Sequence, residues 1–175
     1  GIDCCHIGQF MNMPDTINIR TAAPTDIPAL RELFDSGVYA GQIRINDTGA
    51  DIDNLQAGYF DDEGRSSFWV AEIESKVVGM VGVQRVGDEI AEIRRLRVRD
   101  GYRRRGIGTN LLDHAVKFCR GHDYMKVVLD VRKERDPAIH LFEKSGFFLA
   151  RTREDEGHKT LDFYVDLYTD PATRG

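Results

Sequence analysis

The chain of 175 residues has few cysteines and no long apolar run, which argues against a disulfide-rich protein and against one that spans a membrane with a helix. Two of its three cysteines, Cys4 and Cys5, are neighbours that would bridge each other only with strain. We therefore expect these two and Cys119 to be reduced thiols. No apolar run approaches the roughly 18 to 20 residues of a membrane span, and the N-terminus lacks the pattern of a signal peptide. A cytoplasmic setting is expected.

The chain also lacks the composition of a metal-binding or a general nucleic-acid-binding protein. Its five histidines are scattered and no paired cysteines accompany them, so no metal-ligand spacing is present. The net charge of -5 disfavours the broad phosphate neutralisation on which nucleic-acid binding depends. With 41% hydrophobic and 30% charged residues, the composition is that of an ordinary globular domain. We expect one domain over residues 15–170. Residues 1–14, which begin with Gly in place of Met, are expected to be a processed or added leader outside it.

Charge is concentrated in two segments. Seven arginines lie between Arg94 and Arg105, whereas the segment from Asp47 to Glu63 is acidic and has no Lys or Arg. The sequence Arg-Arg-Arg-Gly-Ile-Gly at 103–108 follows a strand-like run and opens a helix-like one. Backbone N–H groups and the positive end of the helix dipole attract an anion at such a turn, and the glycines allow it to approach the main chain. The loop therefore predicts a phosphate cradle.

Hydrophobic periodicity predicts an α/β (α+β) fold, in which a mixed, mostly antiparallel sheet of about six to seven strands is combined with about four helices. Apolar residues at helical spacing from Ile107 to Cys119 form one helix face, and the strands on either side of this helix make a βαβ crossover. The expected strands are residues 16–21, 68–73, 77–86, 89–98, 126–131, 147–153 and 160–168. Helices are expected from residue 24, over 51–60, from 107 to about 121, and over 136–146, with an irregular segment at 37–50.

Two motifs in this order resemble the GNAT superfamily (Gcn5-related N-acetyltransferases). The family's signature is Arg or Gln, two residues, Gly, one residue, then Gly or Ala, and Arg103, Gly106 and Gly108 match it. The segment from Asp136 to Phe147 is similar to the family's later helix with its closing Gly-Phe. The resemblance implies a single GNAT-like domain that transfers the acetyl group of acetyl-CoA directly to a primary amine, without an acyl-enzyme and without a metal. Dimers are frequent in the family, so the resemblance leaves a homodimer open.

The same resemblance implies a cofactor site where the strands 89–98 and 126–131 splay apart. The pyrophosphate would lie on the amides of residues 104–109, and the pantetheine arm would pair with the main chain of residues 96–98. Arg135 occupies a position where the family often has Asn, and it reaches a phosphate or faces solvent. The implied cofactor-binding residues are Leu96, Arg97, Val98, Arg103, Arg104, Arg105, Gly106, Ile107, Gly108, Thr109 and Arg135.

Catalytic residues are implied less directly. Glu92 matches the position of a general-base glutamate in some GNAT enzymes, but it also fits a strand carboxylate paired with Arg94; Glu89 is a weaker substitute. The family's usual general-acid tyrosine is replaced by Phe142, which has no proton to donate. Tyr164, His140 or a water would serve instead, or the thiolate would leave unaided.

The acceptor site is the least patterned part of the chain. The acidic segment 47–63 falls where the family's acceptor-site helices lie, and it predicts attraction of a cationic amine. The polar segment 153–159, which contains His158, corresponds to a loop that often borders the acceptor site in the family.

Three alternatives compete with an acetyltransferase. A dinucleotide-binding turn requires a third glycine where Leu111 stands. A binding module or sensor could keep the acyl-CoA cradle without catalysis, consistent with Phe142 in place of the tyrosine. A nucleic-acid binder could use the arginine cluster, which however lacks interleaved aromatic residues.

Overall fold

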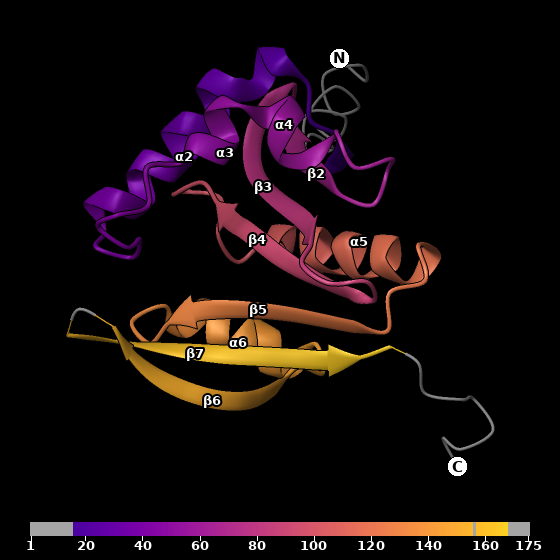
Figure 1. Ribbon diagram of the computed structural model, residues 1–175. Coiled ribbons are helices and arrows are strands. Elements are labelled where there is room, and N and C mark those ends of the chain that lie inside the picture. The colour runs from indigo at the N-terminus through magenta and orange to yellow at the C-terminus, as the bar shows by residue number, and fades with distance from the viewer. Residues whose placement is uncertain (1–15, 156, 168–175) are drawn as a thin grey trace, which may run out of the picture.

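A computed structural model describes residues 16–155 and 157–167, and within them it has a seven-stranded sheet with helices on both faces (Figure 1). The expected leader, residues 1–14, lies outside the described residues. The strands are β1 (Asn18–Thr21), β2 (Ser67–Ile73), β3 (Lys76–Arg85), β4 (Ile90–Val98), β5 (Lys126–Arg132), β6 (Phe148–Asp155) and β7 (His158–Asp166). The helices are the 3-10 turn η1 (Pro24–Asp26), α2 (Ile27–Tyr39), α3 (Ala50–Asp53), α4 (Leu55–Tyr59), α5 (Ile107–Gly121) and α6 (Asp136–Lys144).

The strand order β1-β2-β3-β4-β5-β7-β6 confirms the predicted mixed sheet. Every neighbouring pair is antiparallel except β4 and β5, which are parallel and joined by α5. The predicted βαβ crossover is therefore present, and β2, β3 and β4 form an antiparallel meander. None of the helices in the described ranges is long and apolar enough to cross a membrane.

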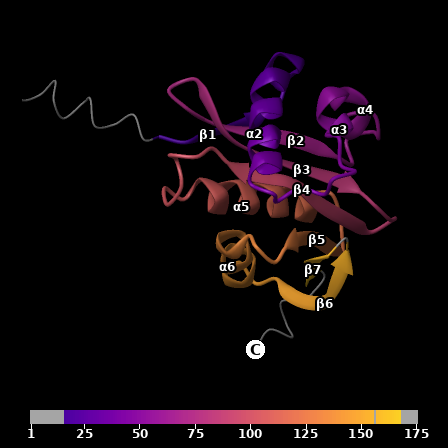
Figure 2. The same cartoon turned by 90° about the vertical axis from the view of Figure 1, so that its left-hand side faces the viewer.

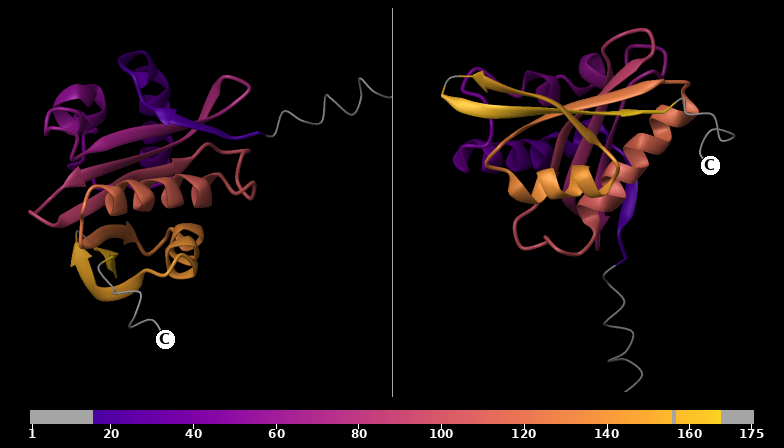
Figure 3. Two further views of the ribbon diagram at one scale, coloured as in Figure 1. Left: turned by 90° about the vertical axis from the view of Figure 1, so that its right-hand side faces the viewer. Right: turned by 90° about the horizontal axis from the view of Figure 1, so that it is seen from below.

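Two layers of helices cover the sheet. Figure 2 shows α2 crossing β2, β3 and β4 on one face, and Figure 3 shows α5 packed on the opposite face. The central strands β2 and β3 are buried almost throughout, as expected for strands covered on both sides. Gly79 on β3 allows α5 to approach closely, because a Cβ there would stand 2.8 Å from a methyl carbon of Leu111.

Three sequence expectations need correction. The single helix expected over 51–60 is two short helices, because Asn54 leaves helical geometry at φ -115° and ψ 59°. Helix α2 continues to Tyr39 and so includes Gly37, which was expected in an irregular segment. With residues 51–60 divided in this way, the described ranges contain five α-helices and a 3-10 turn. The polar segment 153–159 belongs mostly to the β6–β7 hairpin, since its residues pair from Arg153 opposite Thr160 to Asp155 opposite His158.

Candidate active site

The site is a V-shaped cleft between β4 and β5. The two strands pair over only three positions, the last being Glu92 opposite Val128, and then diverge; Figure 1 shows the resulting separation. Beyond this point β4 also contains a β-bulge. Gly82 of β3 pairs with Arg94 and Met80 pairs with Arg97, so β4 has one residue more than β3 between these pairs. A cavity of about 300 Å³ opens between the strands beyond Glu92.

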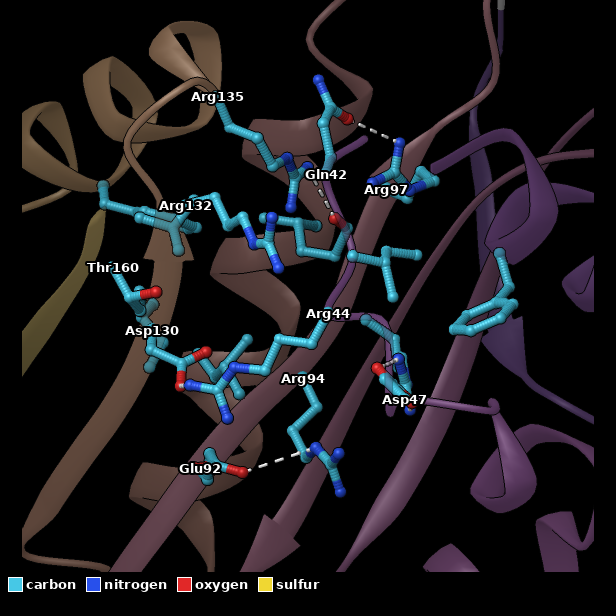
Figure 4. Close-up of a pocket in the computed structure, with 18 of the residues that line it drawn as sticks. Gln42, Arg44, Asp47, Glu92, Arg94, Arg97, Asp130, Arg132, Arg135 and Thr160 are labelled. Atoms are coloured by element: carbon cyan, nitrogen blue, oxygen red, sulfur yellow. Dashed lines mark hydrogen bonds and ion pairs between the residues drawn. The ribbon is translucent and has the colours of Figure 1, made fainter. Parts of the chain in front are cut away.

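Glu92 lies at the narrow end of this cleft and lines it (Figure 4). Its side chain is about one-third exposed and forms an ion pair with Arg94 at 3.4 Å. Burial raises the pKa of the Glu92 carboxyl above its ordinary value of 4.5, and the nearby Asp130 raises it further, while Arg94 opposes both. The sequence left open whether Glu92 is a base or a partner of Arg94. In the structure Glu92 pairs with Arg94 and also lines the cleft, so both interpretations remain compatible with its position.

The loop before α5 has the backbone of an anion-binding turn. Arg104 and Gly106 both have left-handed conformations, at φ 64° and 77°, and no side chain caps the helix that begins at Ile107. The first turn of α5 contains no acidic residue, and Gly106 faces open space. The Ile107 side chain turns into the core. Uncapped N–H groups at the start of a 15-residue helix can therefore receive an anion.

The three arginines of this loop are at the surface. Arg103 forms an ion pair with Asp100 at 3.2 Å, and Arg105 lies over the ring of Tyr102. Gly108 sits where a Cβ would come within 3.2 Å of Leu141 on α6, so it permits close packing of the two helices. Thr109, in the first turn, follows it. The predicted cradle residues are thus brought together at the end of the sheet where β4 leads into α5.

Three arginines point into the cleft itself. Arg97 and Arg132 are each only 7% exposed, and Arg135 donates to the carbonyl of Leu96 at 3.0 Å. Arg135 is half-buried, and its hydrogen bond occupies the main-chain carbonyl of Leu96, where the resemblance places pantetheine. Burial, followed by the charges of Arg97 and Arg103, lowers the pKa of Arg135 to about 10. The neighbouring Val98 is half-buried.

Arg132 is a site residue that the sequence analysis did not identify. It ends β5 and carries no motif, so its only signal is that it shares a strand face with Asp130, two positions earlier. Its Nε is buried without a hydrogen-bond partner in the described ranges.

The candidate general acids are dispersed. Phe142 is buried and lines the cleft, where it packs with Phe147 and Phe163. Tyr164, on β7 opposite Val128, lines a neighbouring cavity of about 530 Å³ that also includes Glu92. His140 is exposed on α6 and lines neither cavity.

The acidic segment 47–63 carries less free negative charge than the sequence suggested, because two arginines pair with three of its six carboxylates. Arg95 holds Asp47 at 2.6 and 2.9 Å and reaches Asp51 at 3.1 Å, while Arg31 pairs with Asp53 at 3.2 Å. Asp62 accepts hydrogen bonds from the backbone and hydroxyl of Ser66. Arg95 thus offsets part of the charge of Asp51 and of Asp47, which lines the cleft, while attraction of a cationic amine by the rest of the segment stays a prediction.

A comparison with known families assigns the chain. A model of the Acetyltransferase (GNAT) family matches residues 30–147, more than half of the chain. The chain belongs to this family, as the two sequence motifs indicated.

Curated relatives match over part of their length. N-acetyltransferase 8 of Homo sapiens is 36% identical over 102 residues, which are 55% of this chain and 44% of that protein. N-acetylaspartate synthetase of Danio rerio is 34% identical over 106 residues, 60% of this chain and 37% of that protein. The chain thus spans about half or less of the length of these relatives.

Solved structures share the fold. The structure of yncA from Salmonella typhimurium with its cofactor acetyl-CoA superposes with a TM-score of 0.76 at 20% identity, covering 89% of this chain and 96% of that one. Ribosomal-protein-alanine N-acetyltransferase from Brucella melitensis gives a TM-score of 0.72 at 23% identity over 86% and 99% of the two chains.

Proposed function

We propose that this protein is an N-acetyltransferase that transfers the acetyl group of acetyl-CoA directly to a primary amine, with Glu92 as general base. The observation that carries the proposal is the cleft between β4 and β5, which has a partly buried carboxylate at its narrow end and an uncapped helix N-terminus beside its open end. Curated relatives bearing the name N-acetyltransferase support it. Calorimetric titration with acetyl-CoA, followed by thiol-release assays on a panel of amines, tests it directly.

The residues present fit acetyl-CoA. The uncapped N–H groups of α5 and the surface arginines 103–105 suit a pyrophosphate, and β4, where it diverges from β5, offers the main chain of Leu96, whose carbonyl accepts from Arg135. Acetyl-CoA would be held by Arg103, Arg104, Gly106, Ile107, Gly108 and Thr109 at its phosphates, with Arg105 beside them, and by Leu96, Arg97 and Val98 through their main chain. When bound, it would supply an activated acyl carbonyl. Arg135 would have to release the Leu96 carbonyl, and its charge would then be free for the cofactor.

A substitution at Gly106 tests the cradle. Gly106→Ala should weaken acetyl-CoA binding about 10-fold, because φ 77° costs an L-residue about 1–2 kcal/mol and the loop would relax away from its anion-binding shape. Gly64→Ala is a matched control, since Gly64 also has a left-handed φ, of 81°, and faces open space far from the loop. Equal losses of affinity in the two variants, measured by calorimetry, would remove the loop from the cofactor site.

Glu92 has the principal chemical task in this proposal. An alkylammonium with a pKa of about 10.4 is neutral in only about one molecule in a few thousand at pH 7, equivalent to about 4 to 5 kcal/mol. The Glu92 carboxylate takes this proton from the acceptor nitrogen, directly or through a water. The raised pKa of Glu92 makes its carboxylate a better proton acceptor near neutral pH. Ala91 and Ile93 on either side of it pack in the core, so the Glu92 side chain lies on the opposite face of β4, toward the cleft.

Tyr164 is the proposed proton donor to the departing thiolate. Tyr164→Phe should lower kcat about 10-fold, less than usual for a general acid, because a thiol with a pKa of about 8.5 is a fair leaving group unaided. The KM for acetyl-CoA should change little. Since the ring also lies over Lys126, the Lys126→Met variant separates loss of the phenol from loss of that contact. If kcat is the same for Tyr164→Phe and the wild type at every pH from 6 to 9, the thiolate leaves without help from Tyr164.

The second candidate is a non-catalytic acyl-CoA-binding module. Its support is Phe142, a buried aromatic residue where the resemblance places a tyrosine. It predicts acetyl-CoA binding with no thiol release from any amine.

Three further parts of the proposal rest on composition and resemblance. We retain a cytoplasmic setting on the basis of the cysteines, of which Cys119 is a buried free thiol. A homodimer remains open by resemblance. Nucleic acid is not a proposed partner, because the chain has a net charge of -5.

A further inference from the structure

Six arginines but only three carboxylates line the cleft, in a chain whose total charge is negative. The carboxylates are Asp47, Glu92 and Asp130. Asp47 is held by Arg95, Glu92 by Arg94, and Asp130 lies 3.6 Å from Arg44 and 3.2 Å from Arg153. The positive charges of Arg97, Arg132 and Arg135 have no carboxylate partner in the part of the chain that the structure describes.

Arg97 and Arg132 converge from opposite sides of the cleft. Arg97 on β4 donates to the side-chain oxygen of Gln42 at 3.1 Å, and Arg132 on β5 reaches the carbonyl of Gly41 at 3.5 Å. Both therefore lie beneath the segment that follows α2, and Figure 4 shows both among the side chains lining the cavity. Neutral oxygens are weak partners for two buried guanidinium groups, and the buried Nε of Arg132 has none in the described ranges.

Two features of the backbone place the Arg97 side chain in the cleft, a bulge in β4 and a glycine in α2. The bulge in β4 puts Arg97 opposite Met80, on the sheet face covered by α2; strict alternation from Glu92 would have turned it toward α5. Gly37, inside α2, leaves space for the guanidinium, because a Cβ there would stand 2.5 Å from Arg97 Nη2. A glycine inside a helix weakens it, so helix stability is lower at the point where the arginine is admitted.

Arg97 and Arg132 lie on the sheet face that distinguishes two possible anions, a cofactor phosphate and an anion bound beside Glu92. The α5 N-terminus, where phosphates would bind, belongs to a helix packed against the opposite face of the sheet (Figure 3). Arg97 and Arg132 instead share their face with Glu92, the proposed base. Burial, together with the charge of Arg103, lowers the pKa of Arg97. An anion in the cleft would stabilise the buried charge of Arg97 and offset its repulsion by Arg103.

We propose that Arg97 and Arg132 bind a carboxylate of the acceptor, so that the acceptor is a small amino acid or related amino carboxylate and not a simple cationic amine. This inference rests on the proposed function and deepens it. The cavity of about 300 Å³ also borders Leu96 and Arg97, whose main chain is assigned to acetyl-CoA, so the space left for the acceptor suits a small molecule. A carboxylate presents two oxygens to the planar fork of an arginine, and its capture there would leave the amine end directed toward Glu92.

Matched acceptors test the proposal. Thiol release from acetyl-CoA is measured with L-phenylalanine against phenethylamine, L-leucine against 3-methylbutylamine, and L-lysine against cadaverine, with L-aspartate and L-glutamate added. Each pair differs by one carboxylate. We expect kcat/KM to favour the carboxylated member by about 10- to 100-fold in the wild type. In Arg132→Met and Arg97→Met this preference should fall to a few-fold, through a higher KM for the amino acid, while acetyl-CoA affinity stays within about 3-fold.

A second measurement needs no turnover. Succinate and malonate, which cannot react, should raise the melting temperature of the wild type and leave that of Arg132→Met unchanged. Arg99→Met is the control variant, because Arg99 is bound to the Val77 carbonyl and Glu32 outside the cleft, and it should behave as the wild type in both assays.

The outcomes separate this inference from the proposed function. Faster transfer to the decarboxylated amines would overturn the inference and leave the acetyltransferase intact. A tenfold or greater loss of acetyl-CoA affinity in Arg132→Met and Arg97→Met, with acceptor preference unchanged, would assign the arginines to the cofactor. Absence of both acetyl-CoA binding and thiol release would overturn the proposed function and this inference with it.

Discussion

Replacement of Glu92 by Gln is expected to lower turnover at pH 7 about 10²- to 10³-fold while acetyl-CoA affinity changes little. Gln keeps the size of the side chain but loses the charge that pairs with Arg94, and it cannot accept the ammonium proton. The variant must wait for the rare neutral amine, so its residual rate should rise about tenfold per pH unit until it reaches the amine's own pKa. Steady-state thiol release from pH 5 to 10 measures both curves.

The wild-type profile supplies a second test of Glu92. The active form is the carboxylate, so the rate should fall as pH drops through the pKa of Glu92. Because burial and Asp130 raise that pKa, this acid limb should lie above the ordinary value of 4.5. The limb should vanish in Glu92→Gln. Glu89→Gln is the matched control, since Glu89 is exposed and lies just before β4 begins at Ile90. A Glu92→Gln rate equal to that of the wild type from pH 6 to 9 would exclude Glu92 from the mechanism.

Local patterns predicted much of the fold and of the cofactor loop. Strand alternation, the apolar face from Ile107 to Cys119 and the Gly-x-Gly turn each depend on residues near one another in sequence, and β4, α5 and β5 follow them. The break at Asn54 could not be predicted, because the helical pattern of the sequence continues across it and only its backbone conformation divides α3 from α4. Gly37 was read as a loop signal, whereas tertiary packing against Arg97 explains its place in α2.

The acceptor side of the cleft could not be predicted, because it depends on contacts between residues far apart in the chain. Arg95 pairs with both Asp47 and Asp51 across more than 40 positions, which offsets one of the two negative charges that the sequence displays there. The bulge at Arg95 shifts the alternation of β4, so the side chain of Arg97 faces α2 although its spacing from Glu92 is odd. The charge of the cleft is thus opposite to that suggested by its nearest acidic segment.

Arg95→Met is expected to destabilise the folded protein by about 3–5 kcal/mol, which corresponds to a fall of roughly 6–20 °C in Tm. The Arg95 side chain is 9% exposed and contacts both carboxylates, so its loss leaves two partly buried negative charges facing each other. It also removes the contacts that hold a non-glycine residue at φ 63°. Chemical denaturation at pH 7 measures the change in free energy of unfolding. Arg85→Met, which breaks an exposed ion pair with Asp88, should cost less than about 1 kcal/mol.

The pH dependence of that deficit identifies its cause. Although burial raises the pKa values of Asp47 and Asp51, hydrogen bonds from Arg95 hold both below their ordinary values, and Tyr59 also donates to Asp51. These depressed pKa values contribute stability above the unfolded-state value of about 3.9, and the contribution is lost as pH falls through the folded-state values. In Arg95→Met the carboxylates lose that partner and protonate more readily, so the gap between variant and wild type should narrow from pH 7 to pH 4. A gap that stays constant over this range would mean that lost packing against Phe34, over whose ring Arg95 lies, outweighs lost charge pairing.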